Sequence, residues 1–134
     1  MTAKEYLWEI GSMDREIDAK LEQAARLRAL SEKVTTVFGD GKGGGGGGTK
    51  DLSGIVAKII DLERAIDVIV DALVDRRREA AAQIEGMRDE RERHVLEWRY
   101  LNQWGWVKIG MELKCSERQA QRIHGRALLK IRVP

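Results

Sequence analysis

Two long segments with apolar residues at heptad spacing, separated by a run of glycines, constrain the fold of this chain most. The first segment carries apolar residues at steps of three and four from Ala3 to Phe38, and the second does so from Leu52 to Leu73. This spacing places an apolar stripe along one side of a helix. Two helices of similar length joined by a short connector pack most simply as an antiparallel hairpin. The sequence therefore predicts an all-α fold that begins with a long, coiled-coil-like antiparallel hairpin over residues 1–88.

Residues 39–50 predict a flexible connector inside this hairpin. They consist of Gly-Asp-Gly-Lys, six consecutive glycines and Thr-Lys, and Asp51 can then cap the second helix. A glycine run contains the spacing GxGxxG, but no strand precedes it and no Gly-Lys-Ser/Thr follows it. A phosphate-binding loop is therefore not indicated.

Further aliphatic side chains lie beside the second stripe, at Val56, Ile60, Val70 and Val74. A single hairpin has no second layer to cover them, and apolar surface of this kind marks an interface. The sequence therefore predicts a homo-oligomer that associates through the hairpin.

Charge is unevenly distributed along the chain. The net charge is +2, but residues 89–134 carry ten Lys/Arg against six Asp/Glu, whereas residues 1–88 carry fourteen against sixteen. A basic end on a slightly acidic helical stem is typical of a protein that meets a polyanion with one end.

Catalysis, metal binding, export and membrane insertion find no support in the sequence. The only soft metal ligands, His94, Cys115 and His124, match no zinc spacing, and no nucleophile lies near a base. The N-terminus lacks a basic leader followed by an apolar core, and charged residues interrupt the most apolar stretches. We therefore expect a cytoplasmic, soluble protein without a cofactor that is not an enzyme.

Residues 89–134 predict a small domain with a helix-turn-helix. Asp89 and Glu92 have capping-box spacing and open a helix over residues 90–102. A short helix over residues 106–114 and a tight turn follow, and Ser116 caps a longer helix. The longer helix buries apolar residues at helical spacing: Ala120, Ile123, Ala127, Leu128 and Ile131.

The other side of that longer helix carries residue types that read DNA bases. The second helix of a helix-turn-helix enters the major groove, where Arg pairs with guanine, Gln with adenine and Glu with cytosine. Every amphipathic helix has a charged outer face, so it is the combination of short helix, turn, cap and basic helix that indicates DNA binding. The predicted base-reading residues are Glu117, Arg118, Gln121 and Arg122. The predicted phosphate contacts, which give affinity and salt dependence, are Arg99, Lys108, Lys114, Ser116, His124, Arg126 and Lys130.

Residues 95–101, 106–110 and 116–131 resemble the region-four helix-turn-helix of sigma factors. The whole chain resembles small phage and prophage proteins related to the RinA and ArpU late-transcription regulators. Gly105 departs from the usual Ser or Thr, and Ala120 from a larger aliphatic residue. The resemblance implies a transcription regulator in a bacterial host cell that binds double-stranded DNA and reads bases with the four residues named above.

Two alternatives remain open from the sequence. Small terminase subunits, which act in DNA packaging, also join a helix-turn-helix to a helical oligomerisation region. A sigma-like adaptor would use the terminal domain to bind RNA polymerase. A complete sigma factor is not expected, because the chain lacks the polymerase-binding region two.

Overall fold

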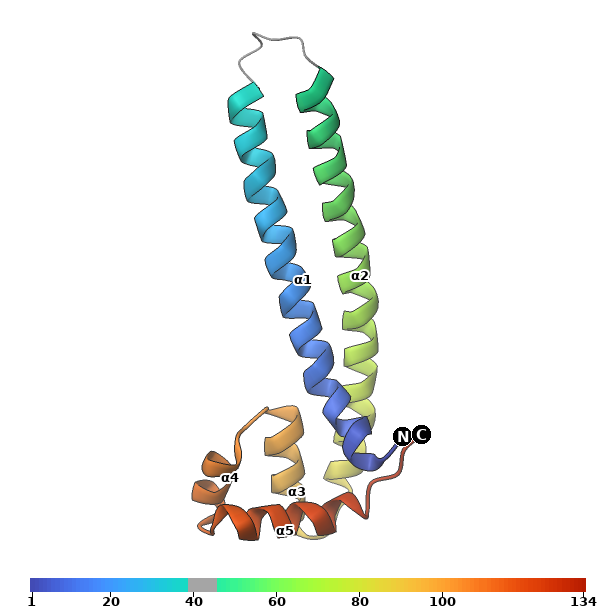
Figure 1. The fold of residues 1–134 in the computed structure, drawn as a ribbon. Helices are drawn as coiled ribbons and strands as arrows, with labels where there is room; N and C mark the ends of the chain where they lie inside the picture. Colours follow the sequence, from blue (N-terminus) through green and yellow to red (C-terminus); the bar gives the residue numbers. More distant parts are fainter. Residues whose placement is uncertain (39–45) are drawn as a thin grey trace. The chain divides into compact units, whose positions relative to one another are not determined.

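The computed structural model describes the backbone of residues 1–38 and 46–134, and the side chains of residues 1–37 and 52–134. Every regular element in these ranges is a helix, which confirms the all-α prediction. None of these helices combines the length and the apolarity needed to cross a membrane. The elements, shown in Figure 1, are α1 (Ala3–Phe38), α2 (Gly46–Glu85), α3 (Glu90–Leu96), the π-helical turn η1 (Glu97–Leu101), α4 (Trp106–Leu113) and α5 (Glu117–Leu128).

The predicted apolar stripes of α1 and α2 lie on the inner sides of a long helical hairpin. All described side chains of both stripes are buried or half-buried, and so are the polar exceptions Lys20 and Arg76. The predicted capping box at the start of α1 is complete, since Glu5 N donates to Thr2 Oγ1 (3.1 Å) and Thr2 N donates to Glu5 Oε2 (3.2 Å). The hairpin prediction is confirmed.

The second helix starts earlier than the sequence indicates. The predicted linker, residues 39–50, falls outside the described residues up to position 45, but α2 already begins at Gly46. Asp51 is therefore inside the helix and is not its N-cap. Glycine costs a helix about 1 kcal/mol per residue relative to alanine, but it can adopt helical backbone angles.

The chain divides into two compact units. Unit 1 consists of residues 1–14 and 72–134, and unit 2 of residues 15–71. A boundary at residue 88, as the sequence predicts, would divide unit 1. Tyr6, Leu7 and Ile10 of α1 are buried and belong to this unit. A domain of residues 89–134 alone is small for an independent core, so the added segments enlarge it.

Polar contacts tie the α1 and α2 segments of unit 1 to each other. Arg76 Nη1 donates to the Tyr6 carbonyl oxygen (3.0 Å) and pairs with Glu9 Oε2 (2.5 Å). The Tyr6 hydroxyl donates to Glu79 Oε2 (2.8 Å). Burial, together with the hydrogen bond to Glu79, raises the pKa of Tyr6 to about 12, so the hydroxyl stays protonated. These contacts explain why an arginine interrupts the apolar stripe of α2.

Two further α2 side chains hold the C-terminal segment. Arg77 Nη1 donates to the Leu101 carbonyl oxygen (3.1 Å). The Gln83 amide donates to the Arg132 carbonyl oxygen (2.7 Å) and accepts from Arg132 N (2.8 Å). The end of the chain is thereby fixed beside α2, and the two termini lie close together in Figure 1.

Unit 2 has a thin core. Within its described part, only Ala24 and Ile66 are fully buried. Seven aliphatic side chains of this unit are exposed: Leu21, Leu30, Val37, Val56, Ile60, Val68 and Val70. A two-helix hairpin offers no further layer to cover them.

The shared core of unit 1 predicts different costs for two leucine truncations on α1. Leu7→Ala removes a fully buried side chain of unit 1, so we expect the free energy of unfolding to fall by about 2–5 kcal/mol. Leu30→Ala, at a side chain that is 45% exposed in unit 2, should change it by less than about 0.5 kcal/mol. Urea unfolding followed by tryptophan fluorescence measures unit 1, because all four tryptophans lie there. Equal effects of the two substitutions would contradict the assignment of residues 1–14 to unit 1.

Candidate nucleic-acid interface

A three-residue turn, residues 114–116, joins α4 to α5. Lys114 adopts the left-handed conformation (φ 56°, ψ 46°) that ends α4. Cys115 N then donates to the Gly110 carbonyl oxygen (2.9 Å). A Cβ atom at Gly110 would lie 3.0 Å from the Cys115 carbonyl oxygen, so a glycine there lets the turn fold closely onto α4. This geometry confirms the predicted helix-turn-helix.

The predicted caps and a small apolar core fix α5 in place. The Ser116 hydroxyl oxygen accepts from Gln119 N (3.1 Å) at the start of α5. Asp89 Oδ1 accepts from Glu92 N (3.1 Å) at the start of α3, and this bond is the main reason why the pKa of Asp89 is lowered. The core beneath α5 consists of Val95, Ile109, Ala120 and Ile123, with Trp98, Trp104, Trp106, Leu113 and Cys115 packed against it.

The helix predicted over residues 90–102 changes its hydrogen-bonding pattern midway. It is α-helical to Leu96 and then forms the π-helical turn η1, with Asn102 N donating to the Glu97 carbonyl oxygen (3.0 Å). A π turn inserts one extra residue and rotates the side chains that follow. Tyr100 is buried within this turn, whereas Trp98, Arg99 and Leu101 are half-buried.

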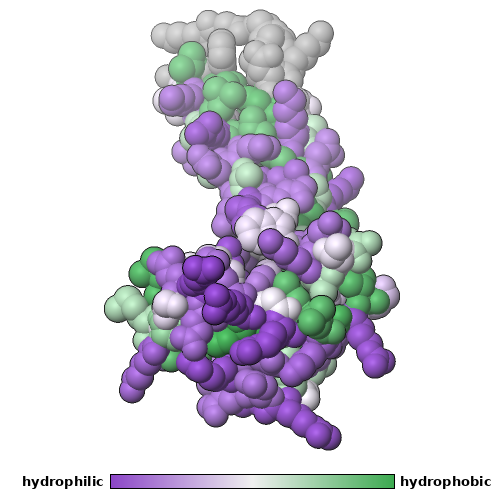
Figure 2. All heavy atoms as spheres, turned by 60° about the horizontal axis from the view of Figure 1, so that its bottom comes forward, coloured by the Kyte–Doolittle hydropathy of each residue, from purple (hydrophilic) through white to green (hydrophobic). Residues whose placement is uncertain are grey.

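The four predicted base-reading residues lie together on the exposed side of the N-terminal half of α5. Within the described residues, the side chains of Glu117, Arg118, Gln121 and Arg122 are exposed and form no hydrogen bond or ion pair with another protein group. Hydrophilic side chains dominate the surface over α5 in Figure 2. These four groups are therefore available to an external partner.

Five of the predicted phosphate contacts are also exposed. Lys114 and Ser116 flank the start of α5, and Arg126 lies farther along it. Lys108 on α4 is exposed as well, and its ammonium group lies 4.1 Å from the centroid of the Trp104 ring. Lys130 lies beyond the end of α5. Unlike the other four, it forms an ion pair, and its partner is the buried carboxylate of Glu92.

Arg99 is half-buried and held by other groups of unit 1. Its Nη1 donates to the Trp104 carbonyl oxygen (3.0 Å), and its guanidinium group lies 4.8 Å from the centroid of the Trp106 ring. Such a stacked guanidinium is fixed in orientation, unlike the side chain of an exposed surface arginine.

His124, one of the predicted phosphate contacts, differs from the exposed ones. Its imidazole is buried beneath α5, packs edge-on against Trp106 and shares a 2.6 Å hydrogen bond between Nε2 and the Tyr100 hydroxyl. Burial, followed by the positive charges of Lys4 and Arg99, lowers the pKa of His124 to about 4. A neutral, buried imidazole holds the helix in place and offers no charge to DNA. The helical spacing itself indicates this burial, because His124 lies four residues after Ala120 and four before Leu128, both on the predicted buried side.

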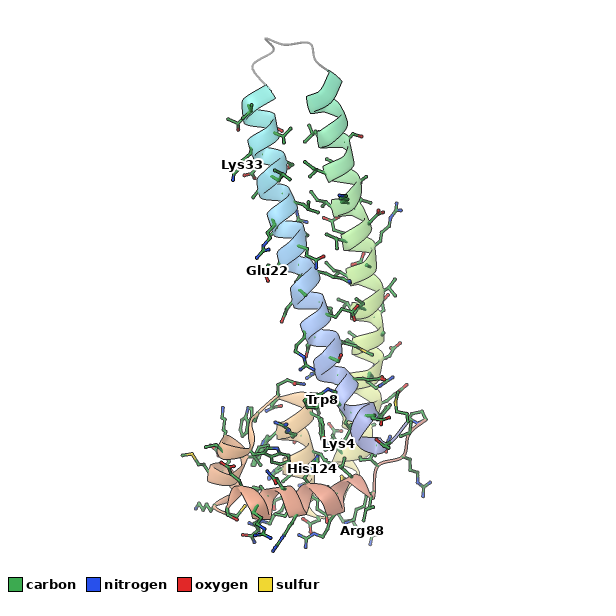
Figure 3. All side chains as sticks on the ribbon, viewed as in Figure 1. Lys4, Trp8, Glu22, Lys33, Arg88 and His124 are labelled. Carbon is green, nitrogen blue, oxygen red and sulfur yellow. The ribbon has the colours of Figure 1, made fainter. Side chains whose placement is uncertain are left out.

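Sequence reasoning missed Lys4 and Trp8, two residues of α1 that lie close to α5. Both line one cavity together with Gln121 and His124, and Figure 3 labels Lys4, Trp8 and His124 in this part of unit 1. No local pattern could have indicated this, because only the packing of α1 against the terminal helices brings these residues together.

Within the described ranges, no three His, Cys, Asp or Glu side chains are grouped so that they could hold a metal ion. Cys115 carries a free thiol and is half-buried at the edge of the apolar core.

Residues 89–133 match the family model of Sigma-70, region 4. The match starts at Asp89, the N-cap residue of α3, and includes α4, the turn and α5. No curated protein and no solved structure matches the chain. The resemblance of the terminal helices to sigma region four is confirmed, and the likeness of the whole chain to the RinA and ArpU regulators stays a prediction.

The buried imidazole predicts a loss of stability in mild acid. Below pH 6.5 an unfolded chain protonates His124, whereas the folded chain resists protonation until about pH 4. Stability that is present above pH 6.5 is therefore lost as the pH falls toward 4, by about 3 kcal/mol from this group. Urea unfolding at several pH values measures this slope. His124→Gln, which does not titrate, should flatten it between pH 6.5 and 4; an unchanged slope in this variant would assign the loss to other groups.

Proposed function

We propose that the protein is a transcription regulator of the phage late-regulator type, which binds double-stranded DNA through α5 and self-associates through unit 2. The observation that carries the proposal is the set of four exposed, unpaired side chains on the N-terminal half of α5, within a segment that matches sigma region four. We assign the protein no catalytic role, and its DNA target places it in the bacterial cytoplasm.

In this proposal α5 enters the major groove with its N-terminal half. Arg118 and Arg122 suit guanine, Gln121 suits adenine and Glu117 accepts from cytosine, with about 1–3 kcal/mol of discrimination for each good pairing. Lys108, Lys114 and Arg126 contact phosphates and supply affinity that is independent of base sequence. The buried side of α5 fixes the direction in which the reading side chains point.

Self-association is supported by the exposed aliphatic surface of unit 2. A groove of about 520 Å³ also runs between its two helix segments, and Leu27 and Leu62 form apolar parts of its wall. Arg26, Lys58 and Asp61 line the same groove, so it carries both signs of charge and suits a second copy of a hairpin with mixed charge. The occupant that we propose is therefore unit 2 of a second copy, which would complete a helical bundle.

One observation favours a second candidate function, that of a sigma-like adaptor. Val107 and Met111, one helical turn apart on α4, are 61% and 74% exposed. Exposed apolar side chains on the helix-turn-helix itself suit a protein partner such as RNA polymerase. Retention of polymerase by the protein in nuclease-treated extract, with loss of that retention in Met111→Glu, would support the adaptor.

Truncation of a reading side chain should weaken DNA binding. Arg122→Ala is expected to lower the affinity for the preferred duplex by about 5- to 150-fold, equivalent to about 1–3 kcal/mol, and to relax the preference at one base position. Arg78→Ala, which removes the same charge from an exposed position of α2 outside the groove of unit 2, is the matched control and should leave the affinity unchanged. Fluorescence anisotropy with labelled duplexes over a salt series measures both. Affinity that is flat with salt, or unaffected by Arg122→Ala, would refute DNA reading by α5.

A charged residue introduced among the exposed aliphatic side chains of unit 2 should weaken self-association. Ile60→Glu is expected to lower the molar mass measured by light scattering, because a buried glutamate would be desolvated at the interface. Val107→Glu, at an exposed position on α4, should leave the mass unchanged. A wild-type mass equal to one chain would exclude self-association. A ring of eight or more copies would favour the packaging alternative over a regulator.

A further inference from the structure

A cavity of about 280 Å³ lies in unit 1 directly beside the reading helix. Four elements supply its walls: α1 contributes Lys4 and Trp8, η1 contributes Arg99 and Tyr100, α4 contributes Trp106, and α5 contributes Gln121 and His124. It is smaller than most drug-sized ligand sites, which begin near about 300 Å³, and suits a small polar group.

The side chains that line this cavity carry positive charge and no negative charge. Its lining includes the ammonium group of Lys4 and the guanidinium group of Arg99, and it includes no Asp or Glu. His124 is neutral, because its pKa lies near 4, and the charges of Lys4 and Arg99 both contribute to that lowering. Two cations around one small cavity attract an anion.

The two cations are placed for binding rather than for stability. Arg99 is fixed between the Trp104 carbonyl oxygen and the Trp106 ring, so its planar donors are oriented before any ligand arrives. Lys4 lies in the first turn of α1, where a positive charge opposes the helix dipole. Within the described residues, no ion pair or hydrogen bond compensates the charge of its ammonium group.

We propose that this cavity binds a phosphate group, with Lys4 and Arg99 as its ligands. The phosphate belongs either to the DNA backbone next to the bases read by α5 or to a free phosphate compound. Gln121 lines the cavity and is also one of the four predicted base-reading residues of α5, so a phosphate in the cavity would lie next to the proposed DNA-binding surface. Binding of a DNA phosphate rests on the proposed function, whereas binding of a free phosphate compound does not.

The DNA source is tested with Lys4→Ala and the matched control Lys33→Ala, an exposed lysine of the same helix in unit 2. One phosphate contact contributes about −0.9 to the slope of log affinity against log salt. Loss of Lys4 should therefore reduce that slope by about 1 and the affinity at 0.1 M salt by about eightfold. The loss should be the same for every duplex sequence, because a phosphate contact reads no base. Lys33→Ala should bind like the wild type.

The free source is tested without DNA. The full-length protein is titrated with inorganic phosphate and with a deoxynucleoside 5′-monophosphate, against chloride at equal ionic strength. Trp8 and Trp106 line the cavity, so tryptophan fluorescence should change in a saturable way in the wild type and in Lys33→Ala, and should not change in Lys4→Ala. Urea unfolding of Lys4→Ala, expected to match the wild type, excludes misfolding as the cause.

The outcomes distinguish the phosphate site from DNA binding by α5, and a DNA phosphate from a free phosphate compound. An effect of Lys4→Ala on DNA affinity alone assigns the site to the DNA backbone, and saturable phosphate binding that requires Lys4 assigns it to a free ligand. If Arg122→Ala weakens DNA binding but Lys4→Ala changes neither assay, the phosphate site is overturned and DNA reading by α5 stands. If the wild type binds no duplex, the proposed function fails, and the phosphate titration alone decides the cavity.

Discussion

The structure of unit 1 depends on the inclusion of the first turns of α1 and the last turns of α2 in the same compact unit as the terminal helices. Tyr6, Leu7 and Ile10 supply large buried side chains to a domain whose own residues, 89–134, would enclose only a small core. Arg77 and Gln83 then fix the last residue of η1 and the C-terminal residues to α2. The hairpin is therefore a structural part of the DNA-binding unit as well as a stem attached to it.

A second consequence of this packing is the buried polar pair beneath α5. Tyr100 is buried within the π-helical turn η1, and its hydroxyl meets His124 from the inner side of α5. A buried hydrogen bond of this kind fixes orientation, because either group would be left unsatisfied if α5 rotated. The direction of the exposed reading side chains thus follows from contacts on the opposite side of the same helix.

Unit 2 follows a different physical rule. In its described part, seven large aliphatic side chains are exposed and only Ala24 and Ile66 are buried, so the free energy available from packing within one copy is small. In our proposal a second copy covers this surface. One reading helix makes few base contacts, and joining two or more through unit 2 raises the effective concentration of each additional helix at the DNA. Self-association and DNA recognition would then be two parts of one mechanism.

The sequence by itself determined the features that depend on local order along the chain. Heptad spacing specified the two stripes, the caps at Thr2, Asp89 and Ser116 marked three helix starts, and the spacing of apolar residues identified the buried side of α5. Only the tertiary structure decided where the units divide and that Lys4 lies beside α5. Periodicity is a property of one helix, whereas these outcomes depend on which helices meet.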